Sequence, residues 1–176
     1  MFGSLFCFIG ANMRQPVLKP FNDARSIGVI LNLRNSNCPD TVAFLDQEAA
    51  RHGIKLHYLL VNLHKHPIPQ WCLDPKMTVI NYKRDFTHTG KLKSDTADEF
   101  INTEFDFLFA VSNHFHPVVK KVATLSKAAF KVGKYFSRDN PYDLTYRPSY
   151  SERNLELTKE YVANIHLITL SDKSDD

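Results

Sequence analysis

Two short polar segments carry the side chains best suited to hold a small ligand. They are residues 34–38 and 112–116, and each follows an apolar run. Arginine offers a permanent charge and a fork of donors to a phosphate or carboxylate, and histidine titrates near neutrality, so it can serve as acid, base or cation. The residues that we predict to line a site are Arg34, Asn35, Ser36, Ser112, Asn113 and His114. The alternative interpretation is that Asn, Ser and Pro here only form turns and cap helices.

Histidine pairs are the most suggestive feature for a metal site. They have the spacing i, i+2, and they are His64 with His66 and His114 with His116. On a strand, such a pair would share one face and could bind a metal. A proline follows each pair, however, which indicates loops with solvated histidines. Further ligands are only scattered candidates, namely Asp106, Cys72 and His88. The sequence therefore predicts neither a metal nor a cofactor.

Recognised catalytic and nucleotide-binding motifs are missing from the sequence. It contains no GxGxxG, GxxxxGK[ST] or GxSxG pattern, and this disfavours the common nucleotide sites and a serine nucleophile elbow. Cys38 lies near an expected helix start, where a thiol pKa can fall, but cysteine is also often a small buried hydrophobe. The three cysteines are far apart and suggest no disulfide framework, so we expect a cytoplasmic protein.

Composition limits the classes of protein to consider. The 176 residues are 43% hydrophobic and 23% charged, which fits one domain with a core of its own. A formal charge of +3 permits nucleic-acid binding without indicating it, and we expect none. No run of about 20 apolar residues is present, so we expect no transmembrane segment. The apolar residues 2–9 lack a preceding basic region, so we expect an N-terminal arm rather than a signal peptide.

Basic residues gather in the second half of the chain. Between Phe107 and Arg138 there is no Asp or Glu, whereas five lysines and Arg138 fall there; the lysines are Lys120, Lys121, Lys127, Lys131 and Lys134. A basic face would attract phosphates or acidic partners. The alternative is a solvated face whose lysines pair with Glu152 or Glu156 of the last expected helix.

Apolar runs alternate with helical patterns along the chain. The expected strands are residues 26–33, 54–61, 77–82, 105–112, 130–133 and 144–146; the expected helices include 117–129 and 151–170, and one that begins near Pro39 and ends at Gly53. Such alternation predicts parallel βαβ units. We therefore expect a three-layer, Rossmann-like, doubly wound α/β fold with a mainly parallel sheet of five or six strands. Residues 1–25 would form an arm, 26–170 one domain and 171–176 a frayed tail.

Two strands should be central neighbours. Residues 29–31 and 107–110 lack the polar alternation of a half-exposed strand. In a doubly wound sheet, ligands bind beyond the carboxyl ends of the strands where the strand order reverses. If these two strands flank that reversal, the two polar segments converge there.

The strand sequences also resemble a known family. Residues 24–32 and 105–112, together with residues 125–134, resemble a family of uncharacterised bacterial, Bacteroidetes-type proteins with a domain of unknown function, over roughly residues 20–170. The second of these strands and the segment 125–134 are also similar to the N-terminal half of heptosyltransferase-type glycosyltransferases, which have two Rossmann-like domains. No stretch of domain size follows residue 150, so this likeness implies a shared architecture rather than transferase activity.

Three functional hypotheses follow. The first is a non-catalytic cytoplasmic domain that binds a small anionic ligand or a protein partner. The second is a transferase or hydrolase that acts on a phosphorylated or nucleotide-sugar substrate between the two segments, with His114 or His116 as the base. The third is an interaction module whose residues 2–9 form an oligomer or touch a membrane surface.

Overall fold

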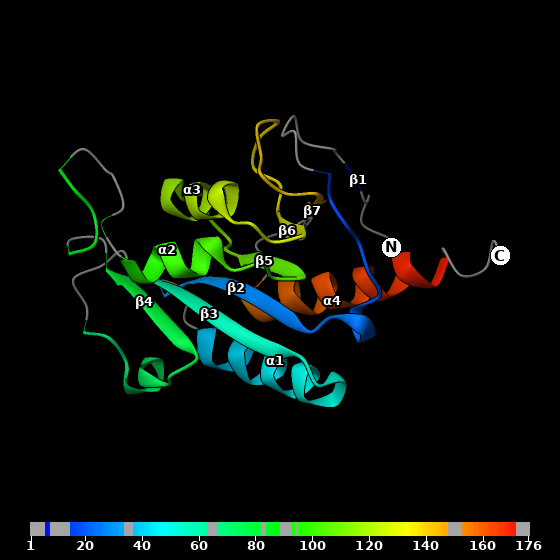
Figure 1. The fold of residues 1–176 in the computed structure, drawn as a ribbon, viewed down its shortest axis with the longest axis horizontal. Coiled ribbons are helices and arrows are strands. Elements are labelled where there is room, and N and C mark those ends of the chain that lie inside the picture. The colour runs from blue at the N-terminus through cyan, green and yellow to red at the C-terminus, as the bar shows by residue number, and fades with distance from the viewer. Residues whose placement is uncertain are drawn as a thin grey trace.

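Six parallel strands form the centre of the structure, and helices cover both of their faces (Figure 1). The computed structural model describes residues 6–7, 15–33, 37–62, 67–81, 84–88, 93, 95–147 and 153–171. The parallel strands are β2 (Ser26–Asn32), β3 (Lys55–Asn62), β4 (Met77–Asn81), β5 (Phe107–Val111), β6 (Phe130–Lys134) and β7 (Leu144–Tyr146). The predicted three-layer, doubly wound fold is confirmed.

The order of the strands places β2 and β5 at the centre. The sheet runs β1-β7-β6-β5-β2-β3-β4, and Val29 of β2 lies beside Phe109 of β5. Without β1, this is the order of a Rossmann sheet, in which the chain first builds outward on one side of the first strand and then on the other. The predicted adjacency of residues 29–31 and 107–110 is confirmed. Strand β1 (Phe6–Cys7) adds an antiparallel edge on β7, which brings this part of the expected N-terminal arm onto its own domain.

In the part of the chain that the structure describes, four α-helices and two short 3-10 helices flank the sheet. Helices α1 (Cys38–His52) and α4 (Asn154–Ser171) pack together against one face, whereas α2 (Asp95–Asn102) and α3 (Pro117–Leu125) cover the other (Figure 1). The 3-10 helices are η1 (Phe21–Asp23) and η2 (Gln70–Leu73). As the sequence predicts, Pro39 lies in the first turn of α1 and Gly53 ends the helix with φ +67°. No helix within the described ranges is long and apolar enough to cross a membrane.

Helix α3 is shorter than the sequence predicts. The expected helix over residues 117–129 ends at Leu125, because Ser126 is extended and its Oγ accepts a hydrogen bond from the backbone N–H of Ala128. The N–H of Lys127 donates to the carbonyl of Ile101 instead of continuing the helix. Residues 126–129 form the extended connection between the end of α3 and the start of β6. Leu125, which the periodicity assigns to the core, is 52% exposed.

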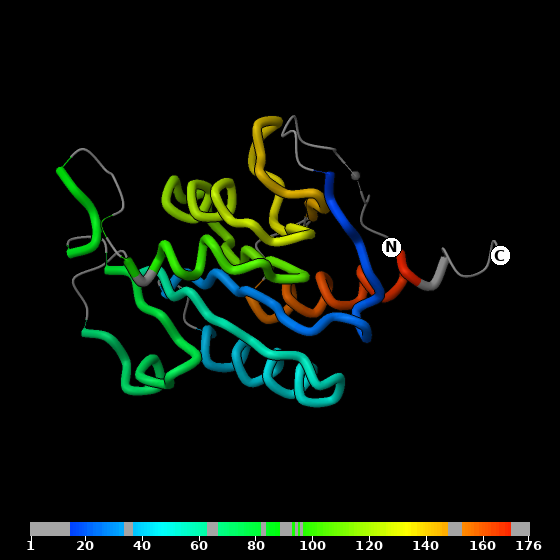
Figure 2. The backbone as a smooth tube through the Cα atoms, viewed as in Figure 1, coloured from blue at the N-terminus to red at the C-terminus, as the bar shows by residue number. Residues whose placement is uncertain are grey.

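The segment before β2 is fastened to the amino ends of the central strands (Figure 2). The carboxylate of Asp106, just before β5, accepts hydrogen bonds from Lys19 Nζ at 2.6 Å and from the N–H groups of Arg25 and Ser26. Partial burial raises the pKa of Asp106, but these donors outweigh that effect, and its pKa lies below the ordinary value. The same segment places Phe21, which is 1% exposed, in the core between the sheet and α4.

Two glycines in the strands leave room for aromatic rings. A Cβ at Gly28 would lie 2.5 Å from the ring of Phe105, and a Cβ at Gly133 would lie 2.5 Å from the ring of Tyr142. Both rings are buried. Gly28 lies inside its strand, where it contributes nothing to a phosphate loop; its role is to admit the ring of Phe105.

We predict that Gly133→Ala destabilises the protein by about 1–3 kcal/mol, because the new methyl group must displace the buried ring of Tyr142. Urea unfolding measures the effect. In a Tyr142→Leu background the clash is relieved, so the same substitution should cost clearly less there. Equal losses in the two backgrounds would contradict this packing argument.

We also predict that His166 makes stability depend on pH. Its ring packs on Phe21 at 4.9 Å and on His52 at 6.0 Å, and burial, followed by the charge of His52, lowers its pKa below 6.5, although Glu48 acts in the opposite direction. The native state therefore binds the proton less well than the unfolded chain, and stability falls as the pH drops below about 6.5. His166→Gln should flatten the free energy of unfolding between about pH 7 and 5, whereas His88→Gln, at an exposed site, should not.

Candidate functional site

The strand order reverses between β2 and β5, and the predicted site residues follow these two strands. The chain leaves β2 toward α1 on one face and leaves β5 toward α3 on the other. No crossover covers the edge between such strands, so ligands commonly bind there. Ser112, Asn113 and His114 come directly after β5. Arg34, Asn35 and Ser36 lie outside the described residues, in the connection between Leu33 and Asn37.

The carboxyl edge of the sheet carries asparagines that are not among the site residues predicted from the sequence. Strands β2, β3 and β4 each end in asparagine, at Asn32, Asn62 and Asn81. Asn62 lies beside Asn81 in the register of the sheet, and Asn32 and Asn62 are only 2% and 4% exposed. The signal in the sequence is an apolar run that ends in Asn three times. Buried amides at strand ends form hydrogen bonds with the connecting loops or with a ligand bound at that edge of the sheet.

Besides Asn154 Nδ2 at the start of α4, two buried amide atoms have no hydrogen-bond partner among the described residues. They are Nδ2 of Asn37, at the N-terminus of α1, and Oδ1 of Asn113, after β5. A buried polar atom without a partner costs about 1–3 kcal/mol, so native proteins usually supply it with water or a ligand. One atom is a donor and the other is an acceptor. The two loops that the sequence predicts to converge thus each present an unsatisfied group.

Ser112 and the histidines of the second loop have distinct positions. Ser112 is 3% exposed, and its Oγ donates to the carbonyl of His114 at 2.7 Å, which holds the turn in shape. The side chain of His114 is exposed. His116 caps α3, because its Nδ1 accepts a hydrogen bond from the N–H of Val118 at 3.2 Å. Protonation of that nitrogen would break the cap, so His116 is poorly suited to act as a base.

Cys38 and Cys72 are buried rather than reactive. Cys38 is 1% exposed and its thiol donates to the carbonyl of Asn32 at 3.3 Å. Burial raises the pKa of Cys72 to about 11. A thiolate nucleophile needs access and a lowered pKa; burial denies access to both thiols, and Cys72 has a raised pKa. Both cysteines therefore act as small buried hydrophobic side chains, which is the alternative that the sequence left open for Cys38.

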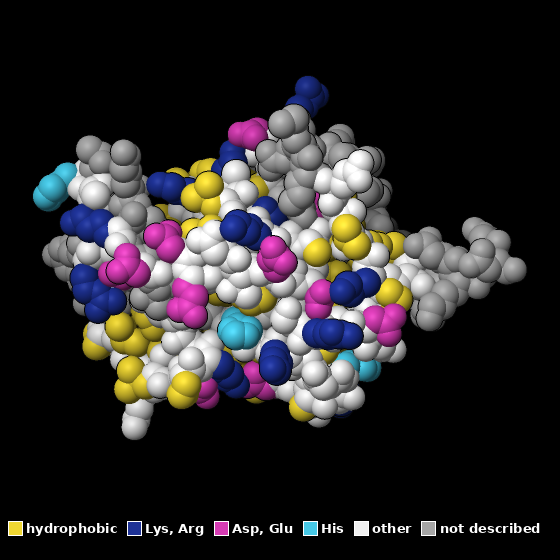
Figure 3. All heavy atoms as spheres, viewed as in Figure 1, with side chains coloured by type: hydrophobic (Ala, Val, Ile, Leu, Met, Phe, Trp, Pro, Cys, Tyr) yellow, Lys and Arg dark blue, Asp and Glu magenta, His cyan; other side chains and the backbone are white. Residues whose placement is uncertain are grey.

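The basic residues between Phe107 and Arg138 do not form one surface. Lys131 is 2% exposed, and its Nζ donates to the carbonyls of Ala123 and Thr124 at the end of α3. Lys120 pairs with Asp139 at 2.6 Å, in the loop after β6 rather than on the last helix. On the face shown in Figure 3, positive and negative side chains are interspersed. These basic residues therefore do not provide a continuous basic face that would attract an anion.

The candidate metal ligands are not gathered into a site within the described part of the chain. No three His, Cys, Asp or Glu side chains of these residues are placed to hold an ion. Asp106 binds Lys19 at the amino edge, and Cys72 is buried in η2. His64 and His66 lie outside the described residues.

We predict that Lys131 stabilises the fold rather than binding a ligand. Lys131→Met keeps the length of the side chain but removes the donor from two helix-end carbonyls, one of them on the buried Ala123. The expected loss is about 1–3 kcal/mol in urea unfolding. Lys127→Met, at an exposed position of the same segment, should change stability by less than about 0.5 kcal/mol. An unchanged free energy of unfolding for Lys131→Met would disprove this role.

Comparison with known proteins gives a family but no activity. No curated protein matches the chain. A family model described as a family of unknown function, DUF6913, matches residues 9–161, which include all six parallel strands and the start of α4. The chain belongs to this family of unknown function.

Proposed function

We propose that this domain binds a small ligand with an anionic group at the carboxyl edge of the sheet, between the ends of β2 and β5. The observation that carries the proposal is the pair of buried, unpartnered amide atoms, Asn37 Nδ2 and Asn113 Oδ1, on the two loops that flank the reversal of strand order. A loop that only made a turn would have no need to bury an unsatisfied polar atom.

The two atoms suggest the chemistry of the ligand. Asn37 Nδ2 needs an acceptor, and it lies at the N-terminus of α1, where free N–H groups and the helix dipole favour a negative charge. We assign Arg34, Asn35 and Ser36, in the same connection, to that anionic group. Asn113 Oδ1 needs a donor, so the ligand should also carry a hydroxyl or amine. Sugar phosphates and hydroxy acids have both groups, and their small size agrees with the absence of a glycine-rich phosphate loop.

The hydrogen bonds within residues 112–116 and at the start of α3 favour binding over catalysis. His116 is engaged as a helix cap and Ser112 Oγ donates to the turn, which leaves His114 as the remaining base candidate of that loop. We therefore propose a non-catalytic, cytoplasmic binding domain that needs no metal or cofactor. The bacterial origin, the likeness to heptosyltransferase-type enzymes, the enzymatic alternative and oligomer formation through residues 2–9 remain predictions from the sequence.

The proposal predicts that Asn37→Ala and Asn113→Ala abolish binding without lowering the stability of the free protein. Each substitution removes an atom that has no partner among the described residues, and Asn37 makes no capping hydrogen bond with its side chain. Thermal shift with sugar phosphates, hydroxy acids and inorganic phosphate identifies a ligand, because a ligand at 100 times its Kd adds about 2.7 kcal/mol. Asn164→Ala, at a half-buried position of α4 where Nδ2 bonds only to the carbonyl of Glu160 in the same helix, is the control.

Arg34→Ala and His114→Ala extend the test to the remaining predicted residues. Loss of affinity in Arg34→Ala would support the anionic contact. If the asparagine variants bind every identified ligand as well as the unmodified protein does, the site lies elsewhere. If they melt well below it, the two amides serve the fold instead.

A further inference from the structure

A cleft of about 260 Å³ lies at the opposite edge of the sheet, near the amino ends of β3 and β4. It is bordered by His57 of β3, Thr78 of β4, Glu99 of α2, and Thr103, Phe100 and Phe105. A water occupies about 30 Å³ in the liquid, so the volume suffices for a small ring with a substituent. Nothing in the proposed ligand site at the carboxyl edge involves these residues.

The inner wall of the cleft is aromatic and rigid. His57 lies beside Gly28 in the register of the sheet, and the missing side chain of Gly28 admits the ring of Phe105. The imidazole of His57 is 5.5 Å from the ring of Phe105, which is in turn 4.9 Å from that of Phe100. Phe100 and Phe105 are buried, whereas His57 is exposed. The exposed part of this wall is therefore the imidazole of His57, which the buried rings behind it hold in place, and a flat aromatic group can stack on it.

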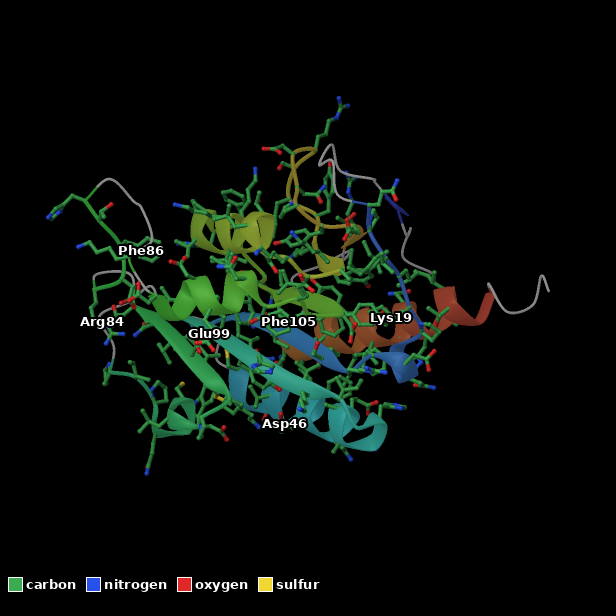
Figure 4. All side chains as sticks on the ribbon, viewed as in Figure 1. Lys19, Asp46, Arg84, Phe86, Glu99 and Phe105 are labelled. Carbon is green, nitrogen blue, oxygen red and sulfur yellow. The ribbon has the colours of Figure 1, made fainter. Side chains whose placement is uncertain are left out.

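Among the described residues, the rim of the cleft carries one lysine, Lys76, and one carboxylate, Glu99. Its cation, Lys76, is already engaged, since Nζ is 2.6 Å from Asp46 Oδ2 and 4.0 Å from Asp74 Oδ2. Glu99 projects from α2 on the other side of the edge strands from Asp46 (Figure 4), and its side chain forms no ion pair among the described residues. The C-terminal end of α2 also lies at the rim, at Thr103, and it adds partial negative charge.

From this geometry we infer that the cleft binds a small aromatic amine, with the ring against the exposed imidazole of His57 and the ammonium group toward Glu99. The hydroxyls of Thr78 and Thr103 lie at the same border and can accept hydrogen bonds from the ammonium group. An anionic ligand would meet the carboxylate of Glu99 and the C-terminal end of α2, both of which repel it. A purely apolar ligand would leave Glu99 without a partner.

The inference is tested on the full chain by amide NMR with three probes of equal size: benzylamine, benzyl alcohol and benzoate. Benzylamine should shift the amides of His57, Thr78 and Thr103 and bind about fivefold more tightly than benzyl alcohol, with benzoate weaker still. Glu99→Gln should bring benzylamine and benzyl alcohol to within about twofold of each other. Glu160→Gln, the same substitution on the exposed side of α4, should leave that difference intact.

Thr78→Tyr tests the location, because its larger side chain should fill the cleft and abolish binding of every probe. Its fold is checked by the dispersion of the amide spectrum; should it fail to fold, the exposed Glu99 variant carries the test alone. Tighter binding of benzoate than of benzylamine, an unchanged preference in Glu99→Gln, or no shift at about 10 mM benzylamine would each overturn the inference.

Discussion

The central strands β2 and β5 are covered by helices on both faces, so their backbone groups can be satisfied only by neighbouring strands. Every residue of β5 and six of the seven residues of β2 are buried. Parallel strands are joined by crossovers that carry helices, and these crossovers are right-handed. The chain builds outward from β2 in one direction and from β5 in the other, so α1 and α3 lie on opposite faces of the sheet. The reversal of strand order, and with it the uncovered carboxyl edge, follows from burying both strands fully.

In β2 and β5, polar side chains therefore lie only at or just beyond the ends of the strands. At their amino ends, Asp106 accepts hydrogen bonds from Lys19 and Arg25 of the segment before β2 and from Ser26, the first residue of β2. At the carboxyl ends, Asn32, Asn62 and Ser112 are buried, and two nearby amide atoms lack partners among the described residues. The carboxylate of Asp106 is satisfied within the chain, whereas Asn37 Nδ2 and Asn113 Oδ1 have no partner among the described residues, and this difference supports the proposal of a ligand site at the carboxyl edge.

The cleft beside α2 has a different physical origin. It is formed because α2 is short and ends near the sheet at Thr103, so the amino ends of β3 and β4 are left partly uncovered on that face. Its chemistry is also different, since its rim carries Glu99 where the carboxyl edge presents amides and a helix N-terminus. The two proposed sites therefore concern ligands of opposite charge and share no residue.

The sequence by itself determined the six parallel strands, the end of α1 at Gly53 and the neighbouring positions of β2 and β5, but not the short edge strand β1. These features depend on local conformation and on continuous apolar runs, and both can be recognised from neighbouring residues in the sequence. Only the tertiary structure decided that Lys131 is buried beneath the end of α3, that α3 stops at Leu125 and that His116 serves as a cap. It alone also brought His57, Thr78 and Glu99 to one cleft, because the register of the sheet and the placement of a helix over it join residues far apart in the chain.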